Sequence, residues 1–165
     1  MDNQTVVSVL TFKGRARLIE EGGSQAWRAD RRKLNHCEFI VCARHANSPF
    51  PAEGDEPHKS AFLVGRISGI VDADTDGEAH DRNLPNRNKI LFSEYAVIDG
   101  PVLALTGQNP VQYWPDLAAL GIDAATLEWQ RVEAKVEKSP IERAKEMVAA
   151  AHGVTADRVD ITIRF

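Results

Sequence analysis

The run of residues 60–71, "SAFLVGRISGIV", constrains the fold of this chain more than any other stretch. Every second residue from Ala61 to Val71 is small or apolar, which is the period of a β-strand that buries one face. Gly65 and Gly69 both fall on that face. A glycine inside a strand often marks a sharp bend or the close approach of a ligand. The run therefore predicts a strand in a strongly curved sheet.

More strands are predicted on both sides of this run. Residues 5–12 and 38–44 are short apolar segments before it, and residues 87–99 follow it as another. Residues 126–136 begin with alternating apolar and polar side chains, and residues 158–165 place four apolar side chains on one face. We therefore expect five or six strands.

The connections between these strands carry few helical signals. Residues 26–34 fit one or two helical turns and residues 109–123 fit a short helix, whereas residues 20–25 and 45–59 have the glycine or proline content of loops. Many short strands joined in this way predict an α+β protein whose core is a small, curved, mostly antiparallel, β-barrel-like sheet.

The strongest helix signal covers residues 140–152. Ser139 is a favourable N-cap, Pro140 suits the first helical position, and Glu142 completes a capping box. Gly153 is a suitable end.

The chain is predicted to divide into a barrel domain, residues 1–137, and a helix–turn–strand appendage, residues 138–165. The appendage is too short to fold alone. It is expected to pack on the barrel or on a second copy of the chain, so a homodimer is one candidate assembly.

The composition describes an ordinary globular protein, with 165 residues and 43% hydrophobic side chains. No apolar run approaches the roughly 18 residues that cross a bilayer. The first residues lack the basic-then-apolar order of a signal peptide. We therefore expect a cytoplasmic protein with no membrane partner.

Basic residues are concentrated near the N-terminus. The net charge is −4, which disfavours binding of nucleic acid through overall electrostatics, yet residues 13–44 hold eight basic and four acidic side chains. This local excess of +4 fits either a basic face or an ordinary solvated surface of mixed charge.

Two patterns look like metal sites. His36, Cys37, Cys42 and His45 have zinc-like spacing, but a strand through both cysteines would point them to opposite faces. The loop of residues 72–83 begins like a calcium loop, with Asp72, Asp74, Asp76 and Gly77, but Asn83 stands where such a loop needs a bidentate Glu. We expect two buried thiols, a solvated turn, no metal and no cofactor.

Enzyme signatures such as a P-loop or a nucleophile elbow are absent from the sequence. His58, Lys59 and Ser60 could support acid–base chemistry, but three adjacent loop residues are a weak pattern. Catalysis is left open, with a binding protein favoured.

The element order from residue 38 to residue 132 resembles the PUA-like superfamily, which includes the EVE, ASCH and YTH domains. The resemblance is carried by three strands and a helix, namely "CEFIVCAR", "AFLVGRISGIV", "KILFSEYAVID" and "NPVQYWPDLAALGID". The ASCH signature Gly-x-Lys-x-x-Glu-x-Arg is not matched by "KGRARLIEEG". The resemblance implies a β-barrel-like domain that binds nucleic acid or a modified base, but it assigns no site residue.

Aromatic and charged residues near the predicted loops and within the strands are candidates for such binding. Aromatic rings stack bases, and guanidinium groups hold phosphates. The candidates for contact with a base are Trp27, Arg66, Glu94, Tyr95, Tyr113 and Trp114. The candidates for phosphate are Arg28, Arg31 and Arg32.

Each of these candidates has a simpler interpretation. Arg66 and Glu94 fit an ordinary cross-strand ion pair, and the aromatic residues fit half-buried structural anchors. The sequence thus favours a small domain that recognises RNA, modified DNA or an unpaired base. The alternative is a non-enzymatic interaction or accessory subunit that uses the appendage.

Overall fold

The computed structural model describes residues 4–47, 53–73, 87–100, 102, 104–133 and 139–164. The chain forms two compact units, Met1–Val132 and Glu133–Phe165. None of the described helices is long and apolar enough to span a membrane. Most of the aspartate loop falls outside the described residues, so its predicted role as a solvated turn stays a prediction.

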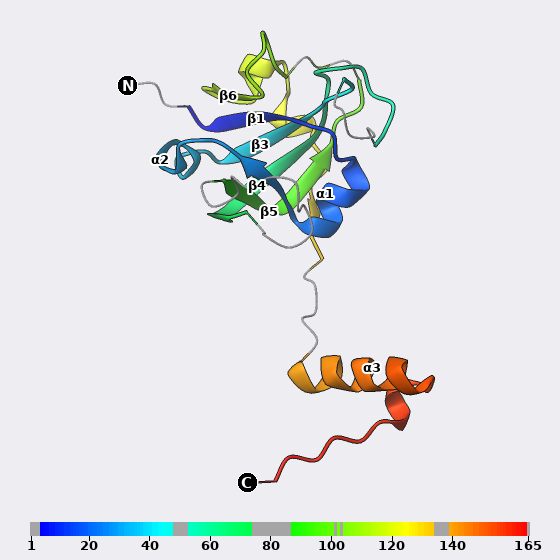
Figure 1. Ribbon diagram of the computed structural model, residues 1–165. Helices are drawn as coiled ribbons and strands as arrows, with labels where there is room; N and C mark the ends of the chain where they lie inside the picture. Colours follow the sequence, from blue (N-terminus) through cyan, green and yellow to red (C-terminus); the bar gives the residue numbers. More distant parts are fainter. Residues whose placement is uncertain are drawn as a thin grey trace. The chain divides into compact units, whose positions relative to one another are not determined.

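In the described part of the first unit, seven strands form one strongly curled sheet (Figure 1). The strands run in the order β2-β5-β4-β3-β1-β6, and β7 pairs with β5. Their bounds are β1 Val6–Thr11, β2 Gly23–Trp27, β3 Phe39–Arg44, β4 Ala61–Asp72, β5 Asn88–Val97, β6 Val111–Trp114 and β7 Gln130–Arg131. The expected α+β protein with a curved sheet is confirmed, as a half-barrel with few short helices.

Every pairing in the described sheet is antiparallel except that of β1 with β3. Because β1 and β3 are parallel neighbours, the chain that leaves the end of β1 must run back to the level at which β1 begins before it enters β3. It does so through α1 (Arg15–Glu21), β2 and α2 (Arg31–Leu34). On the way β2 pairs with β5, at the other side of the sheet.

Two apolar clusters pack on the two faces of this sheet. We call the cluster that holds Leu18 of α1 and Leu34 of α2 the inner cluster. The outer cluster includes Val41 and Val64 from the sheet and Leu117 and Ile122 from the segment after β6. That segment contains the short 3₁₀ helices η2 (Ala118–Leu120) and η3 (Ala124–Thr126).

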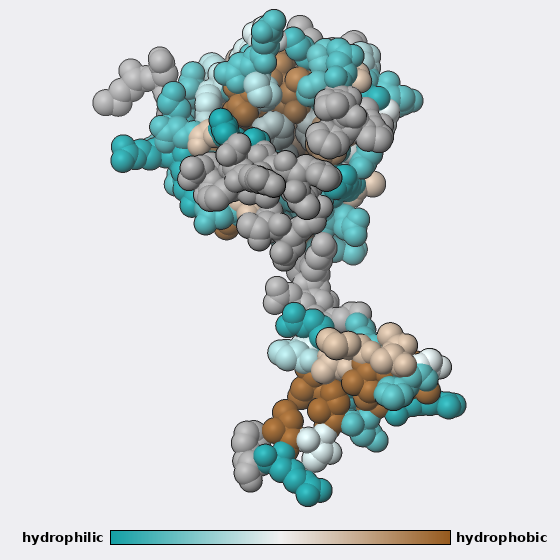
Figure 2. Space-filling model, viewed as in Figure 1, coloured by the Kyte–Doolittle hydropathy of each residue, from teal (hydrophilic) through white to brown (hydrophobic). Residues whose placement is uncertain are grey.

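The second unit contains α3 (Pro140–His152) and the 3₁₀ helix η4 (Ala156–Arg158). The predicted helix and its capping box are confirmed: Ser139 Oγ accepts a hydrogen bond from the Glu142 N–H, and Glu142 Oε2 accepts one from the Ser139 N–H. Gly153 ends the helix with φ of 67°. Apolar residues gather on the visible surface of this unit (Figure 2).

The strands predicted at residues 5–12, 38–44, 60–71 and 87–99 are confirmed as β1, β3, β4 and β5. The prediction for residues 158–165 is wrong, because residues 159–164 form no strand. An alternating pattern only favours a strand, and the described residues of this unit offer no neighbouring strand to pair with.

Three further predictions fail where tertiary pairing decides the structure. Residues 20–25 are not a loop, since they contain the end of α1 and the start of β2. Residues 109–123 are not one helix, because Val111–Trp114 pairs with β1 as β6. The strand predicted at residues 126–136 is reduced, in its described part, to β7.

Gly65 makes room for an aromatic ring rather than for a ligand. A Cβ atom at this position would lie 2.7 Å from Cγ of Phe92, on the neighbouring strand, and 2.9 Å from its Cβ. Phe92 is buried in the inner cluster. The missing side chain of Gly65 therefore lets β4 and β5 curl closely around this ring.

We expect Gly65→Ala to lower the free energy of unfolding by about 1–3 kcal/mol, because Phe92 must shift in a packed core. Gly69→Ala is the matched control, since its Cβ would meet nothing closer than Leu91 Cδ1 at 4.0 Å. We expect the control to change stability by less than about 0.5 kcal/mol. Urea denaturation measures both, and equal losses for the two variants would contradict this account of Gly65.

Candidate nucleic-acid interface

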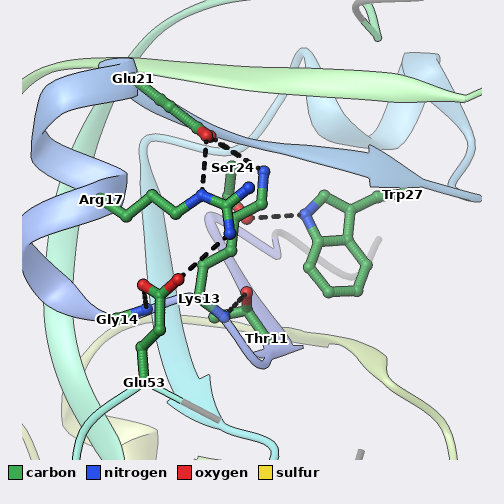
Figure 3. A network of polar contacts seen from close by, with 8 residues as sticks. All are labelled: Thr11, Lys13, Gly14, Arg17, Glu21, Ser24, Trp27 and Glu53. Carbon is green, nitrogen blue, oxygen red and sulfur yellow. Dashed lines mark hydrogen bonds and ion pairs between the residues drawn. The ribbon is translucent and has the colours of Figure 1, made fainter. Parts of the chain in front are cut away.

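Trp27 is held in a defined orientation at the end of β2. The pairing of β2 with β5 shifts register between Ser24 and Trp27, where Ala26 has φ of 72°. The indole Nε1 of Trp27 donates a hydrogen bond of 2.9 Å to Ser24 Oγ (Figure 3). One part of the ring packs against the inner cluster, and the side chain is half-buried.

The single turn of α2 exposes three consecutive basic residues. Asp30 caps its N-terminus by accepting a hydrogen bond of 2.8 Å from the Arg32 N–H. Leu34 is the one residue of this turn that is buried. Arg31, Arg32 and Lys33 are consequently exposed.

Asn88 fastens this basic turn to the sheet. It is only 5% exposed, although it is polar. Its Oδ1 accepts a hydrogen bond of 2.8 Å from Arg31 Nε, and its Nδ2 donates one of 2.9 Å to the Ala29 carbonyl. The neighbouring Arg87 donates from Nη1 to the Ala26 carbonyl at 2.8 Å. The start of β5 thus holds both ends of the segment from Ala26 to Arg31.

These contacts assemble a basic surface that we call the α2 patch. It consists of Trp27 with the cations Arg28, Arg31, Arg32, Lys33 and Arg87, and the carboxylates Asp30 and Asp72. Arg31 is engaged by Asp72 and Asn88. Arg28 and Arg32 are exposed, and no ion pair holds either guanidinium group within the described part of the chain.

Tyr113 approaches the same region from β6. The Nζ atom of Lys33 lies 5.6 Å from the centroid of its ring. Its hydroxyl group is buried and has no hydrogen-bond partner among the described residues. Burial is the main cause that raises the pKa of Tyr113 to about 12, with smaller contributions from Cys37 and Asp30. Tyr113 therefore lies against the α2 patch as a neutral phenol.

Arg66 and Glu94 form the cross-strand ion pair that the sequence indicates. They are direct partners in the pairing of β4 with β5, with Arg66 Nε 2.9 Å from Glu94 Oε2. The Arg66 guanidinium carbon also lies 4.8 Å from the ring centroid of Trp129, which stacks on Phe39. Both rings pack against the outer cluster.

The structure therefore divides the predicted site between the two faces of the sheet. Tyr95 packs against the inner cluster, and its hydroxyl donates a hydrogen bond of 2.9 Å to Gln130 Oε1. Trp114 packs against the outer cluster, and its Nε1 donates one of 2.9 Å to Ser8 Oγ. Adjacent strand residues point to opposite faces, so Trp114 lies away from Tyr113. Arg66, which is paired with Glu94, also contacts two rings that pack against the outer cluster.

A polar network around α1 was not predicted from the sequence (Figure 3). Lys13 is 5% exposed, and its Nζ lies 3.0 Å from Glu21 Oε2. Arg17 contacts both Glu21, at 3.2 Å, and Glu53, at 3.1 Å. Glu53 also accepts a hydrogen bond from the Gly14 N–H, which is the main cause that lowers its pKa.

This network positions α1 against the loop that precedes β4. Its one signal in the sequence is the spacing of Arg17 and Glu21, four residues apart on a helix. Lys13 and Glu53 are brought to it by the fold. Because each of its charged groups faces an opposite charge, we interpret the network as structural.

His58 and Lys59 also have structural contacts. His58 Nδ1 accepts a hydrogen bond of 3.1 Å from the Ala46 N–H, and its ring meets that of His45 edge-on at 5.4 Å. Lys59 donates from Nζ to the carbonyl of Gly107. Burial, with the nearby charges of His45 and Lys59, lowers the pKa of His58. These residues hold neighbouring loops together.

Both cysteines are buried free thiols, as predicted. They pack in the same inner cluster, so the expectation of opposite faces is wrong. The physical reason is that β3 begins at Phe39, and Cys37 lies before the alternation starts. Burial raises the pKa of Cys37 to about 11 and that of Cys42 to about 12. The described residues contain no cluster of three His, Cys, Asp or Glu placed to hold a metal.

Hollows lined by other described residues of the first unit are alternative candidate sites, and three of them stand out. One of about 550 Å³ includes Glu38, Asp116 and Asp123 in its lining, and one of about 440 Å³ includes Asp99, Asp123 and Glu128. The third, of about 420 Å³, combines Arg15 with three carboxylates. None of the predicted base- or phosphate-binding residues lines these hollows. Their acidic linings disfavour a phosphate-bearing ligand.

No protein-family model matches this chain, and no curated protein matches it significantly. The resemblance to the PUA-like superfamily therefore stays a prediction, and the function is inferred from the geometry of the site.

We expect Asn88→Ala to lower the free energy of unfolding by about 1–3 kcal/mol, because the Ala29 carbonyl and Arg31 lose their buried partner. Trypsin should also cleave the α2 patch faster, since its basic residues are then less firmly held. Ser93→Ala, at an exposed position of the same strand, is the control. Unchanged stability together with unchanged cleavage of Asn88→Ala would show that Asn88 does not fasten α2.

Proposed function

We propose that this protein binds single-stranded RNA, or an unpaired or modified nucleobase, at the α2 patch. One observation carries the proposal: Asn88 and Arg87 hold a half-buried tryptophan beside a group of exposed cations. A flat ring next to guanidinium groups matches the two parts of a nucleotide, its base and its phosphate.

The orientation of Trp27 favours stacking. Its hydrogen bond to Ser24 and its contact with the inner cluster fix the ring before a ligand arrives. Little side-chain entropy is then lost on binding. Stacking of one base on an aromatic side chain contributes roughly 1–3 kcal/mol.

The phosphate contacts fall to the arginines that are not already engaged. Arg31 is occupied by Asn88 and Asp72, so it positions the patch. Arg28 and Arg32 are exposed and form no ion pair with any described residue, so they are the candidates for phosphate contacts. Among the described residues the patch has five cations and two carboxylates, so their summed charge is positive although the net charge of the chain is −4.

The residues on the outer face are not part of this proposed site. Trp114 is bonded to Ser8 there, and the guanidinium group of Arg66 is shared between Glu94 and Trp129. A base stacked on Trp27 would be separated from these side chains by the sheet, because Trp27 packs against the inner cluster. The base-reading role considered for these residues would require a second ligand site.

We expect short single-stranded oligoribonucleotides to bind at low salt, with a slope of log K against log salt of about −1.5 for two phosphate contacts. Fluorescence anisotropy of labelled unmodified and base-modified oligonucleotides measures this. Trp27→Ala should weaken binding by roughly 5- to 150-fold, because one stacking contact is lost.

Charge reversal tests the position of the site. The double variant Arg28→Glu/Arg32→Glu should weaken binding by at least about tenfold. The control Arg131→Glu/Arg143→Glu changes the net charge equally at exposed residues elsewhere and should leave affinity within about threefold. Absence of binding to every oligonucleotide, or equal weakening by both pairs, would refute the proposal.

A second function, that of an interaction subunit, concerns the other unit of the chain. It is favoured by the apolar side chains that α3 and the following segment leave exposed. The two functions use different residues, so one does not exclude the other.

A further inference from the structure

The second unit buries little of its own apolar surface. Among its described residues only Ala149 is buried. Six larger apolar side chains of these described residues are exposed, Met147 and Ile163 most of all, at 73% and 60%. The others are Ile141, Val148, Val154 and Ile161. Exposed apolar side chains in one small unit indicate an interaction surface.

The backbone after η4 is also left without partners. Val159 has the extended conformation, with φ of −104° and ψ of 123°, and the chain continues past it without secondary structure (Figure 1). Within the described part of the chain, no backbone hydrogen bond joins residues 160–164 to another residue. Extended backbone whose N–H and C=O groups are unpaired can form hydrogen bonds with another strand.

The sequence of residues 160–164, Asp-Ile-Thr-Ile-Arg, is complementary to itself in the antiparallel direction. If two copies pair about Thr162, Asp160 of one copy stands opposite Arg164 of the other, and this happens twice. Ile161 then stands opposite Ile163, also twice. Directly opposed side chains of opposite charge, or of matching apolar character, stabilise an antiparallel pair. The same symmetry makes a two-fold dimer.

We propose that residues 160–164 pair with the same residues of a second copy of this chain, as a two-stranded antiparallel ribbon centred on Thr162. The exposed apolar side chains of α3 are covered in the same dimer, because an isolated two-stranded ribbon is marginally stable in water. A second copy is favoured over another protein because the ends of the segment carry charges that complement each other.

This pairing explains why the segment has a strand-like pattern without being a strand. Alternation places Ile161 and Ile163 on one face and the charged residues on the other. The pattern is satisfied only when a partner strand supplies the hydrogen bonds. The inference is independent of the proposed nucleic-acid site, since it uses none of its residues.

The test measures the mass of the full chain by sedimentation equilibrium, without nucleic acid, between about 1 and 200 µM. We expect the wild type to dimerise in this range. Asp160→Arg places Arg opposite Arg twice, and Arg164→Asp places Asp opposite Asp twice. Each variant should raise the dimer dissociation constant by at least about tenfold.

Recombining the charges provides the decisive comparison. An equimolar mixture of the two single variants should form a heterodimer, because each Arg then meets an Asp. The double variant Asp160→Arg/Arg164→Asp should dimerise with an affinity within about threefold of that of the wild type. No general effect of charge on folding produces this recovery.

Control variants keep the change of charge but move it outside the paired segment. Asp157→Arg and Arg158→Asp alter exposed residues of η4 and should leave the dissociation constant within about twofold. Helix content measured by circular dichroism should be equal for all variants. A wild type that stays monomeric at 200 µM overturns the proposal. A dimer that both single reversals leave unchanged also overturns it, and would place the interface elsewhere, as would loss of the dimer in the controls.

Discussion

The parallel pairing of β1 with β3 is the constraint on which the first unit depends. Parallel neighbours require a crossover, and this chain builds it from α1, β2 and α2. The two helices contribute Leu18 and Leu34 to the inner cluster, while β2 pairs with β5 beyond β4. Because β2 belongs to the crossover and also pairs with β5, the sheet must curl around the inner cluster. Gly65 permits the tight approach of Phe92 at the centre of the curl.

The same crossover creates the candidate site. The segment between β2 and β3 has room for only one turn of helix, and a single turn buries a single side chain, Leu34. Its basic residues must therefore face solvent. Without further contacts, such a short exposed segment would be mobile. Asn88, which is buried, fixes it through two hydrogen bonds. Local positive charge on an acidic protein is thus a consequence of how the chain crosses the sheet.

Much of the sheet could be predicted because its strands carry their own pattern. The runs that became β1, β3, β4 and β5 are apolar and rich in branched residues, so local preference and tertiary structure agree. By contrast, β2 begins Gly-Ser-Gln, which has low β-propensity, and it is a strand because β5 pairs with it. For the same reason the local sequence of β6 favours a helix, and β6 is a strand because it pairs with β1.

The candidate site was predictable only where it is local in sequence. Trp27 and the arginines after it lie within six residues, so their association could be read from the chain. Asn88 lies 57 residues after Arg31, and nothing in its neighbourhood marks it as a partner. Residue type alone groups Trp114 with Trp27. The alternation of β6 sends it to the other face, which could be known only after the strand was identified.

Hydrogen exchange of the backbone amides measures most directly where the ligand binds. Exchange should be followed by mass spectrometry with and without a saturating single-stranded oligoribonucleotide. A ligand at the α2 patch should slow exchange in residues 26–35 and 87–88, and it should leave exchange in residues 114–129, on the outer face, unchanged. Protection confined to residues 114–129, or spread equally over both regions, would contradict binding at the α2 patch.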